Sequence, residues 1–313
     1  MARFFTFGDQ HQLWDPSHRF QTSWLVPPYV LFAIRLLLSL YAFTTLLFNI
    51  GYVCATPSQG GCASARSNFS FFTVLSYWGV AFYFLIAAFH TLFYARRGSA
   101  PLDTWPRALQ FLHSLYYSSV TVFPFLVVIV FWALLASSTA LSTEYLAWIN
   151  ISQHILNSVF AFIEIVIPRT RPPPWSHLPF LIFLLALYLA LAYLTHATKG
   201  FYTYTFLDPS LQGSLVAAYV FGIAVGVSIL FAVVWGLIWL RRWITEEKLG
   251  FDGVFAHAAG GDGGDLRRDG EDGGVDDGDD VENGGRRRHG GAGKDMMNNG
   301  RSQHGMAEVN PGV

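Results

Sequence analysis

Long apolar runs recur along the chain up to about residue 243, separated by short polar stretches. A run of about 20 apolar residues is long enough to cross the hydrocarbon core of a bilayer. In lipid, backbone N–H and C=O groups must find hydrogen bonds within their own segment, so each run is predicted to be an α-helix. The pattern therefore predicts an all-α integral membrane protein with six transmembrane helices. The runs are 29–53, 70–95, 115–136, 147–167, 178–198 and 214–240.

Composition divides the chain into three parts. The 313 residues are 52% hydrophobic and 13% charged, and the charges lie mostly outside the apolar runs. Residues 1–27 are predicted to form a cytosolic N-terminal segment without a signal-peptide pattern, and residues 28–243 the transmembrane domain. Residues 244–313 are rich in Gly, Asp and Arg, and are predicted to be a disordered cytosolic tail because they cannot bury enough apolar surface to fold.

The positions of Lys and Arg predict how the helices cross the membrane. Basic residues gather on the cytosolic side of membrane proteins, so we expect both termini in the cytosol and the loops 54–69, 137–146 and 199–213 outside it. We expect an endomembrane, such as the endoplasmic reticulum, or the plasma membrane. One side would carry only Arg66 and Lys199, and the other Arg3, Arg19, Arg96, Arg97, Arg107, Arg169, Arg171, Arg241, Arg242 and Lys248.

The chain has two cysteines, Cys54 and Cys62, and both fall in the first of these outer loops. An oxidising compartment permits a disulfide there. We therefore predict that the two cysteines are bonded, with two free thiols as the alternative.

Two charged residues, Arg35 and Glu164, lie within the apolar runs, and both are nearer the cytosolic ends. At about 1.5 Å per residue their depths in the membrane can match. A charge inside a bilayer is costly unless it is paired. We predict a buried structural ion pair between the first and fourth helices, with a proton relay as the alternative.

Polar residues at a second depth suggest chemistry. His154 lies about 9 Å below Trp148, while His196 and Thr73 each lie about 5 Å below the same outer surface. A hydroxyl beside an imidazole is the minimal pair of nucleophile and base. We therefore predict Thr73 and His154 as catalytic residues, with His196 and Asn150 in support. The alternative is that these side chains only bond neighbouring helices.

Two other classes of function compete with catalysis. A carrier or channel would use Arg35, Glu164 and the histidines as a polar path, but these groups fall into two separate layers. A haem protein would use His154 and His196 as axial ligands. Gly222 and Gly226 form a small-residue pair that favours packing within the chain, with a homo-oligomer as the alternative.

Three motifs resemble the androgen-induced protein family, six-helix membrane proteins that include hydrolases of fatty acid esters of hydroxy fatty acids. They are the sequence WINISQH at 148–154 with FAFIE at 160–164, HAT at 196–198 with GFYTYTFLD at 200–208, and FFT at 71–73. The resemblance covers roughly residues 70–240. Lys199, Thr205 and the Gly/Asp tail depart from the family pattern.

The resemblance implies a threonine hydrolase, with Thr73 as nucleophile and His154 as its base. A lipid ester would enter sideways from the membrane, and Thr73 would attack its carbonyl carbon while His154 takes the proton. We therefore expect membrane lipid and a lipid ester as partners, no nucleic acid, and neither a cofactor nor a metal.

Overall fold

The computed structural model describes residues 13–251, all of which belong to the first of two units into which the chain divides. Within this range the regular structure is helical, and the one β contact is an isolated bridge between Ser23 and Pro168. The elements are α1 Pro28–Ala55, η1 Pro57–Gln59, α2 Gly61–Ser67, η2 Asn68–Ser70, α3 Phe72–Arg97, η3 Pro101–Thr104, α4 Arg107–Val130, η4 Phe131–Leu135, α5 Glu144–Ile151, η5 Ser152–Leu156, α6 Asn157–Val166, α7 His177–Lys199, η6 Thr205–Leu207, α8 Pro209–Gln212, α9 Leu215–Arg242 and η7 Trp243–Lys248.

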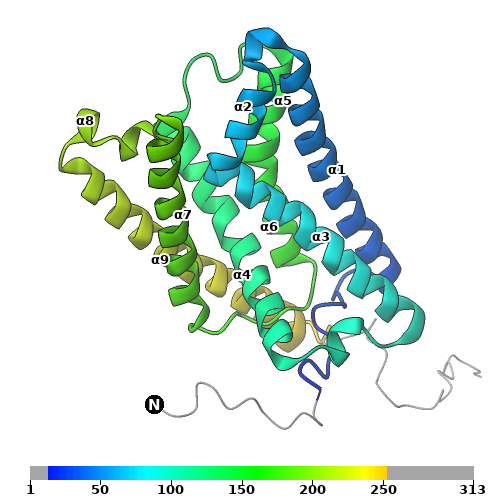
Figure 1. Ribbon diagram of the computed structural model, residues 1–313. Helices are drawn as coiled ribbons and strands as arrows, with labels where there is room; N and C mark the ends of the chain where they lie inside the picture. The colour runs from blue at the N-terminus through cyan, green and yellow to red at the C-terminus, as the bar shows by residue number, and fades with distance from the viewer. Residues whose placement is uncertain (1–12, 252–313) are drawn as a thin grey trace, which may run out of the picture. The chain divides into compact units, whose positions relative to one another are not determined.

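Within residues 13–251, six helical spans are long and apolar enough to cross a membrane, which confirms the predicted all-α architecture and the number of spans for this part of the chain. The chain is an integral multi-pass membrane protein. The spans are Pro28–Ala55, Phe72–Arg97, Arg107–Leu135, Glu144–Val166, His177–Lys199 and Leu215–Lys248. The connections that carry α2 and α8 lie at the same end of the bundle, together with the start of α5 (Figure 1). We call this the α2 end.

The third and sixth spans are each seven residues longer than the sequence predicts, with 29 and 34 residues. The third begins at Arg107 because its polar first turns are buried: Gln110 is 2% exposed and its amide donates to the Leu102 carbonyl at 3.0 Å. The sixth continues to Lys248, so the predicted start of a disordered tail at residue 244 is wrong. An ion pair between Glu246 Oε1 and Arg19 Nη1, at 2.5 Å, stabilises this extension. The rest of the predicted tail, residues 252–313, lies outside the described residues.

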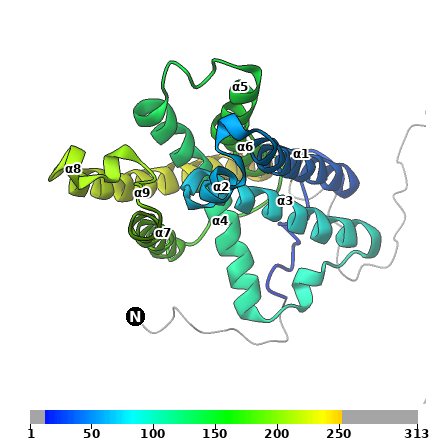
Figure 2. The same ribbon diagram turned by 45° about the horizontal axis from the view of Figure 1, so that its top comes forward.

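The hydrophobic core lies among α1, α3, α4, α6 and α9. Helix α1 packs along α3, and α7 lies beside α9, as both views show (Figures 1 and 2). Helices α7 and α9 expose large apolar side chains such as Phe183 and Phe221, at 57% and 72%. Hydrocarbon solvates such side chains without cost, so these faces suit contact with lipid.

Gly226 packs near Leu126, while a side chain at Gly222 would meet no neighbour within 4 Å among the described residues.

Residues 13–27 of the N-terminal segment pack against the end of the bundle opposite α2, and several of their side chains are buried there. Trp24 Nε1 donates to the Val166 carbonyl at 2.7 Å, and Ser23 Oγ to the Ile167 carbonyl at 2.8 Å. These bonds satisfy carbonyls that a helix end leaves without intrahelical partners.

Arg35 and Glu164 form the predicted ion pair, and each is 1% exposed. The contact is bidentate, with Arg35 Nη2 to Glu164 Oε1 at 2.5 Å and Nε to Oε2 at 3.1 Å. Arg35 Nη1 also donates to the Phe20 carbonyl at 2.7 Å and to Thr91 Oγ1 at 2.6 Å, while the Tyr83 hydroxyl donates to Glu164 Oε1 at 2.9 Å. One arginine thus joins α1, α3, α6 and the N-terminal segment.

Cys54 and Cys62 are bonded, as the sequence predicts. The disulfide joins two residues that are eight positions apart, one near the end of α1 and the other in α2. It therefore fixes α2 at the C-terminal end of α1, beside the segment that leads into α3.

The ion pair yields a prediction about stability. Replacing Arg35 by Met leaves the Glu164 carboxylate buried without its partner, so we expect a loss of about 3–5 kcal/mol in the free energy of unfolding in mixed micelles. The double variant Arg35→Met/Glu164→Met should lose less than Arg35→Met alone, because no buried charge remains unpaired. Arg97→Met, at an exposed position, should change the free energy by about 0.5 kcal/mol or less. Equal losses in the single and double variants would contradict this account.

Candidate active site

Thr73 lies where two cavities near the α2 end share part of their walls. The first, of about 180 Å³, is almost wholly apolar and lies between α4, α7 and α9. The second, of about 430 Å³, has a more polar lining from α1, η4, α5 and η5. Thr73, Phe131, Leu135 and Tyr204 line both cavities. A ligand held at Thr73 can therefore extend in two chemically different directions.

Thr73 is the second residue of α3, and the loop after α7 reaches it through Tyr204. The Phe72 N–H donates to the Tyr204 hydroxyl at 3.1 Å, and Thr73 and Tyr188 are further hydrogen-bonding neighbours of the same hydroxyl. Burial raises the pKa of Tyr204, and these hydrogen bonds oppose that rise. The net rise means that the phenol keeps its proton at neutral pH.

His154 lies on a π-helical turn, η5, that interrupts the fourth span. Ser152, Gln153 and His154 are buried in succession, at 0%, 4% and 7% exposure. A regular α-helix turns one of three consecutive residues away from its buried face, and the wider π turn changes this register. Such turns are frequent at functional sites. Here the turn brings both Gln153 and His154 into the polar cavity.

The His154 ring stacks on Phe131, with ring centroids 3.5 Å apart and planes 6° from parallel. Phe131 itself begins a π-helical turn, η4, at the end of α4. The Nδ1 atom of His154 and the Nε2 atom of Gln153 are buried without a hydrogen-bond partner among residues 13–251. Buried polar atoms without partners are rare, so these two are free to bind a ligand or water in the cavity.

The structure brings Thr73, His154 and Asn150 to one cavity, and places His196 elsewhere. Thr73 and His154 line it without a direct hydrogen bond between them in the described part of the chain. The Asn150 amide donates to the Ala140 carbonyl at 2.8 Å, so it fixes the loop before α5.

The expectation that His196 joins Thr73 and His154 is therefore not met in this geometry. Its ring stacks on Tyr202, with centroids 3.8 Å apart, and it is absent from the lining of both cavities. Matching depth does not fix the direction in which a helix points its side chain. A haem held between His154 and His196 would need both rings at one cavity, and the polar cavity that His154 lines does not include His196.

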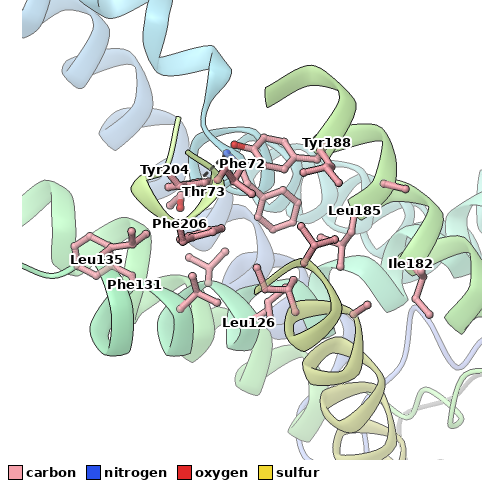
Figure 3. Close-up of a pocket in the computed structure, with 18 residues that line it drawn as sticks. Phe72, Thr73, Leu126, Phe131, Leu135, Ile182, Leu185, Tyr188, Tyr204 and Phe206 are labelled. Atoms are coloured by element: carbon pink, nitrogen blue, oxygen red, sulfur yellow. Dashed lines mark hydrogen bonds between the residues drawn. The ribbon is translucent and has the colours of Figure 1, made fainter. Parts of the chain in front are cut away.

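The apolar cavity reaches the face of the bundle between α7 and α9. Ile182 and Ala224 line both this cavity and a shallow groove on the outer surface of these helices. Figure 3 shows the cavity running from Phe131 and Leu135, past Leu126, towards Leu185 and Ile182, with Thr73 and Tyr204 near its edge. An acyl chain in the membrane thus has an apolar route towards Thr73.

No group of three or more His, Cys, Asp or Glu side chains that could hold a metal ion occurs in residues 13–251. The donors around Thr73 are hydroxyls, amides and one imidazole, which suit proton transfer and hydrogen bonding.

Two residues of the site, Tyr204 and Phe131, are not among those predicted from the sequence. Tyr204 falls within the aromatic block at 200–208, but the sequence does not show that its loop folds back to α3. Phe131 belongs to an apolar run like any other, and no sequence signal marks it as the stacking partner of His154.

Comparison with known proteins gives no relative: the chain matches no family model, no curated protein and no solved structure. The resemblance of its motifs to the androgen-induced protein family therefore stays a prediction.

The apolar cavity yields a prediction about lipid binding. Ala224→Trp places a large ring where the cavity meets the outer groove, so affinity for a fluorescent long-chain fatty acyl ester should fall at least about tenfold, measured by fluorescence titration in nanodiscs. Val233→Trp is the matched control, since Val233 lies on the same helix, is 50% exposed and lines none of these cavities. Equal affinity in the two variants would remove the cavity as the lipid site.

Proposed function

We propose that this protein is a membrane-embedded hydrolase of lipid esters, with Thr73 as the nucleophile and His154 as its base. The observation that carries the proposal is the shared cavity: Thr73 from α3 and His154 from η5 line it together, next to an almost wholly apolar cavity that meets the outer groove between α7 and α9. A nucleophile and a base at the edge of a lipid-accessible cavity are the parts that ester hydrolysis requires.

The reaction proceeds in two acyl transfers. Thr73 Oγ attacks the ester carbonyl carbon while its proton passes to the neutral imidazole of His154. The bond to the alcohol then breaks, and His154 returns the proton to the departing oxygen. A water molecule repeats the sequence on the acyl-threonine, which releases the fatty acid and restores the Thr73 hydroxyl.

The two cavities bind different parts of the substrate. The acyl chain lies in the apolar cavity between α4, α7 and α9, and the alcohol part and the water use the polar cavity lined by Asn49, Gln153 and Asn150. His154 and Thr73 have no direct hydrogen bond before substrate binds. Catalytic hydrogen bonds in free enzymes are often long and tighten in the substrate complex.

The motif resemblance supports fatty acid esters of hydroxy fatty acids as the substrate class. Such esters carry two long chains, and a site at the membrane interface can accept both. The distribution of basic residues supports cytosolic termini, which would place the α2 end, with its disulfide and the site, at the lumenal or outer surface.

The proposal predicts the behaviour of two variants towards a fluorophosphonate probe of active hydrolases and towards a fluorogenic long-chain ester. Thr73→Ala should abolish labelling and hydrolysis, because the nucleophilic oxygen is gone. His154→Ala should lower kcat by about 10²–10⁴-fold, the range of a general base.

The matched control is Thr121→Ala, which removes a buried hydroxyl that donates only to carbonyls of its own helix, α4. It should label and hydrolyse within about twofold of the wild type. Labelling that survives in folded Thr73→Ala protein would rule out Thr73 as the nucleophile.

A further inference from the structure

Tyr204 holds a position that the proposed pair of Thr73 and His154 leaves unexplained. Its hydroxyl lies at the N-terminus of α3, where the Phe71 cap position provides no side-chain hydrogen bond. The Phe72 N–H donates to this oxygen at 3.1 Å, and Thr73, the next residue of the helix, is a further hydrogen-bonding neighbour. A helix N-terminus carries a partial positive charge, so it polarises any hydroxyl that accepts its N–H groups.

The hydroxyl is also held firmly. Tyr204 stacks on Phe206 with centroids 5.1 Å apart and meets Phe71 edge-on at 5.8 Å. Phe206 and Leu207 are buried, and the Tyr193 hydroxyl donates to the Leu207 carbonyl at 3.3 Å, which ties the loop to α7. Rigid support of this kind is what a group acting in a transition state requires.

The direction of the hydrogen bonds determines what Tyr204 can do. The Phe72 N–H can only donate, so the Tyr204 oxygen is its acceptor, and the phenol O–H can itself donate to an acceptor beside Thr73. Burial raises the pKa of this phenol, so it acts as a donor and not as a base. Tyr204 lines both cavities beside Thr73, the position of an ester carbonyl under attack.

We propose that Tyr204 is a further catalytic residue, whose phenol O–H donates a hydrogen bond to the carbonyl oxygen of the ester as Thr73 attacks. This inference rests on the proposed ester hydrolysis. The Phe72 N–H at the start of α3 is occupied by Tyr204, so the phenol transmits the positive potential of this helix end to the substrate.

The chemical step balances without a further reactant. As the Thr73 oxygen bonds to the carbonyl carbon, the carbonyl π electrons move onto the oxygen, and the Tyr204 proton stays on the phenol while it stabilises that negative charge. The electrons return when the bond to the alcohol breaks. The proton that leaves Thr73 goes to His154, so Tyr204 and His154 have separate roles.

Tyr204→Phe keeps the aromatic contacts and removes only the hydroxyl. We expect kcat for a fluorogenic long-chain ester to fall by about 10²–10³-fold, the effect of losing one oxyanion donor, with KM within about threefold of the wild type. Tyr219→Phe is the matched control, since Tyr219 packs against Phe206 of the same loop and its phenol lines neither cavity at Thr73. It should retain kcat within about twofold.

A second variant separates catalysis from support of the loop. Difluorotyrosine at position 204 keeps the hydrogen bonds but ionises at lower pH, so the loss of kcat at alkaline pH should begin at lower pH than in the wild type. A purely structural role would leave that profile unmoved.

The outcomes distinguish the two proposals. If Thr73→Ala abolishes hydrolysis but folded Tyr204→Phe keeps kcat within twofold, or if difluorotyrosine leaves the alkaline limb in place, the role of Tyr204 is wrong and the hydrolase stands. If the wild type shows no hydrolysis that depends on Thr73, both proposals fall.

Discussion

The buried pair of Arg35 and Glu164 is the contact on which the arrangement of the helices depends. Each partner is 1% exposed, and the pair is surrounded by apolar helices. A charge in such a place is tolerated only when its hydrogen bonds are satisfied. Arg35 meets this condition with a carboxylate from α6, a hydroxyl from α3 and a carbonyl from the N-terminal segment. The relative positions of these elements are therefore constrained by one side chain.

This constraint lies far along the bundle from the candidate site, and the separation has a functional consequence. The ion pair fixes the helices near the end opposite α2, while loops and π turns shape the α2 end. Two π turns, at η4 and η5, present Phe131 and His154 to each other. A site at the ends of helices can contact water on one side and apolar side chains on the other. Hydrolysis of a lipid ester needs both environments.

The spacing of apolar runs and the cost of an unpaired charge in a membrane predict part of this structure well. The number of spans, the pairing of Arg35 with Glu164 and the bond between Cys54 and Cys62 all follow from the sequence. Depth counting brings Thr73 and His154 to one cavity but fails for His196, because depth says nothing of rotation about the helix axis. The start of the third span at Arg107 and the extension of the sixth past residue 244 escape prediction, since buried polar residues there look like loop residues.

The sequence by itself determined the membrane class and the layer in which each polar residue lies, because apolar length and rise per residue are local properties. Only the tertiary structure decided which side chains in a layer face one another. Rotation of each helix, the π turns and the path of the loop to Tyr204 result from packing between segments far apart in the chain. For that reason Tyr204, which contacts Thr73 directly, appears in the site only once the chain is folded.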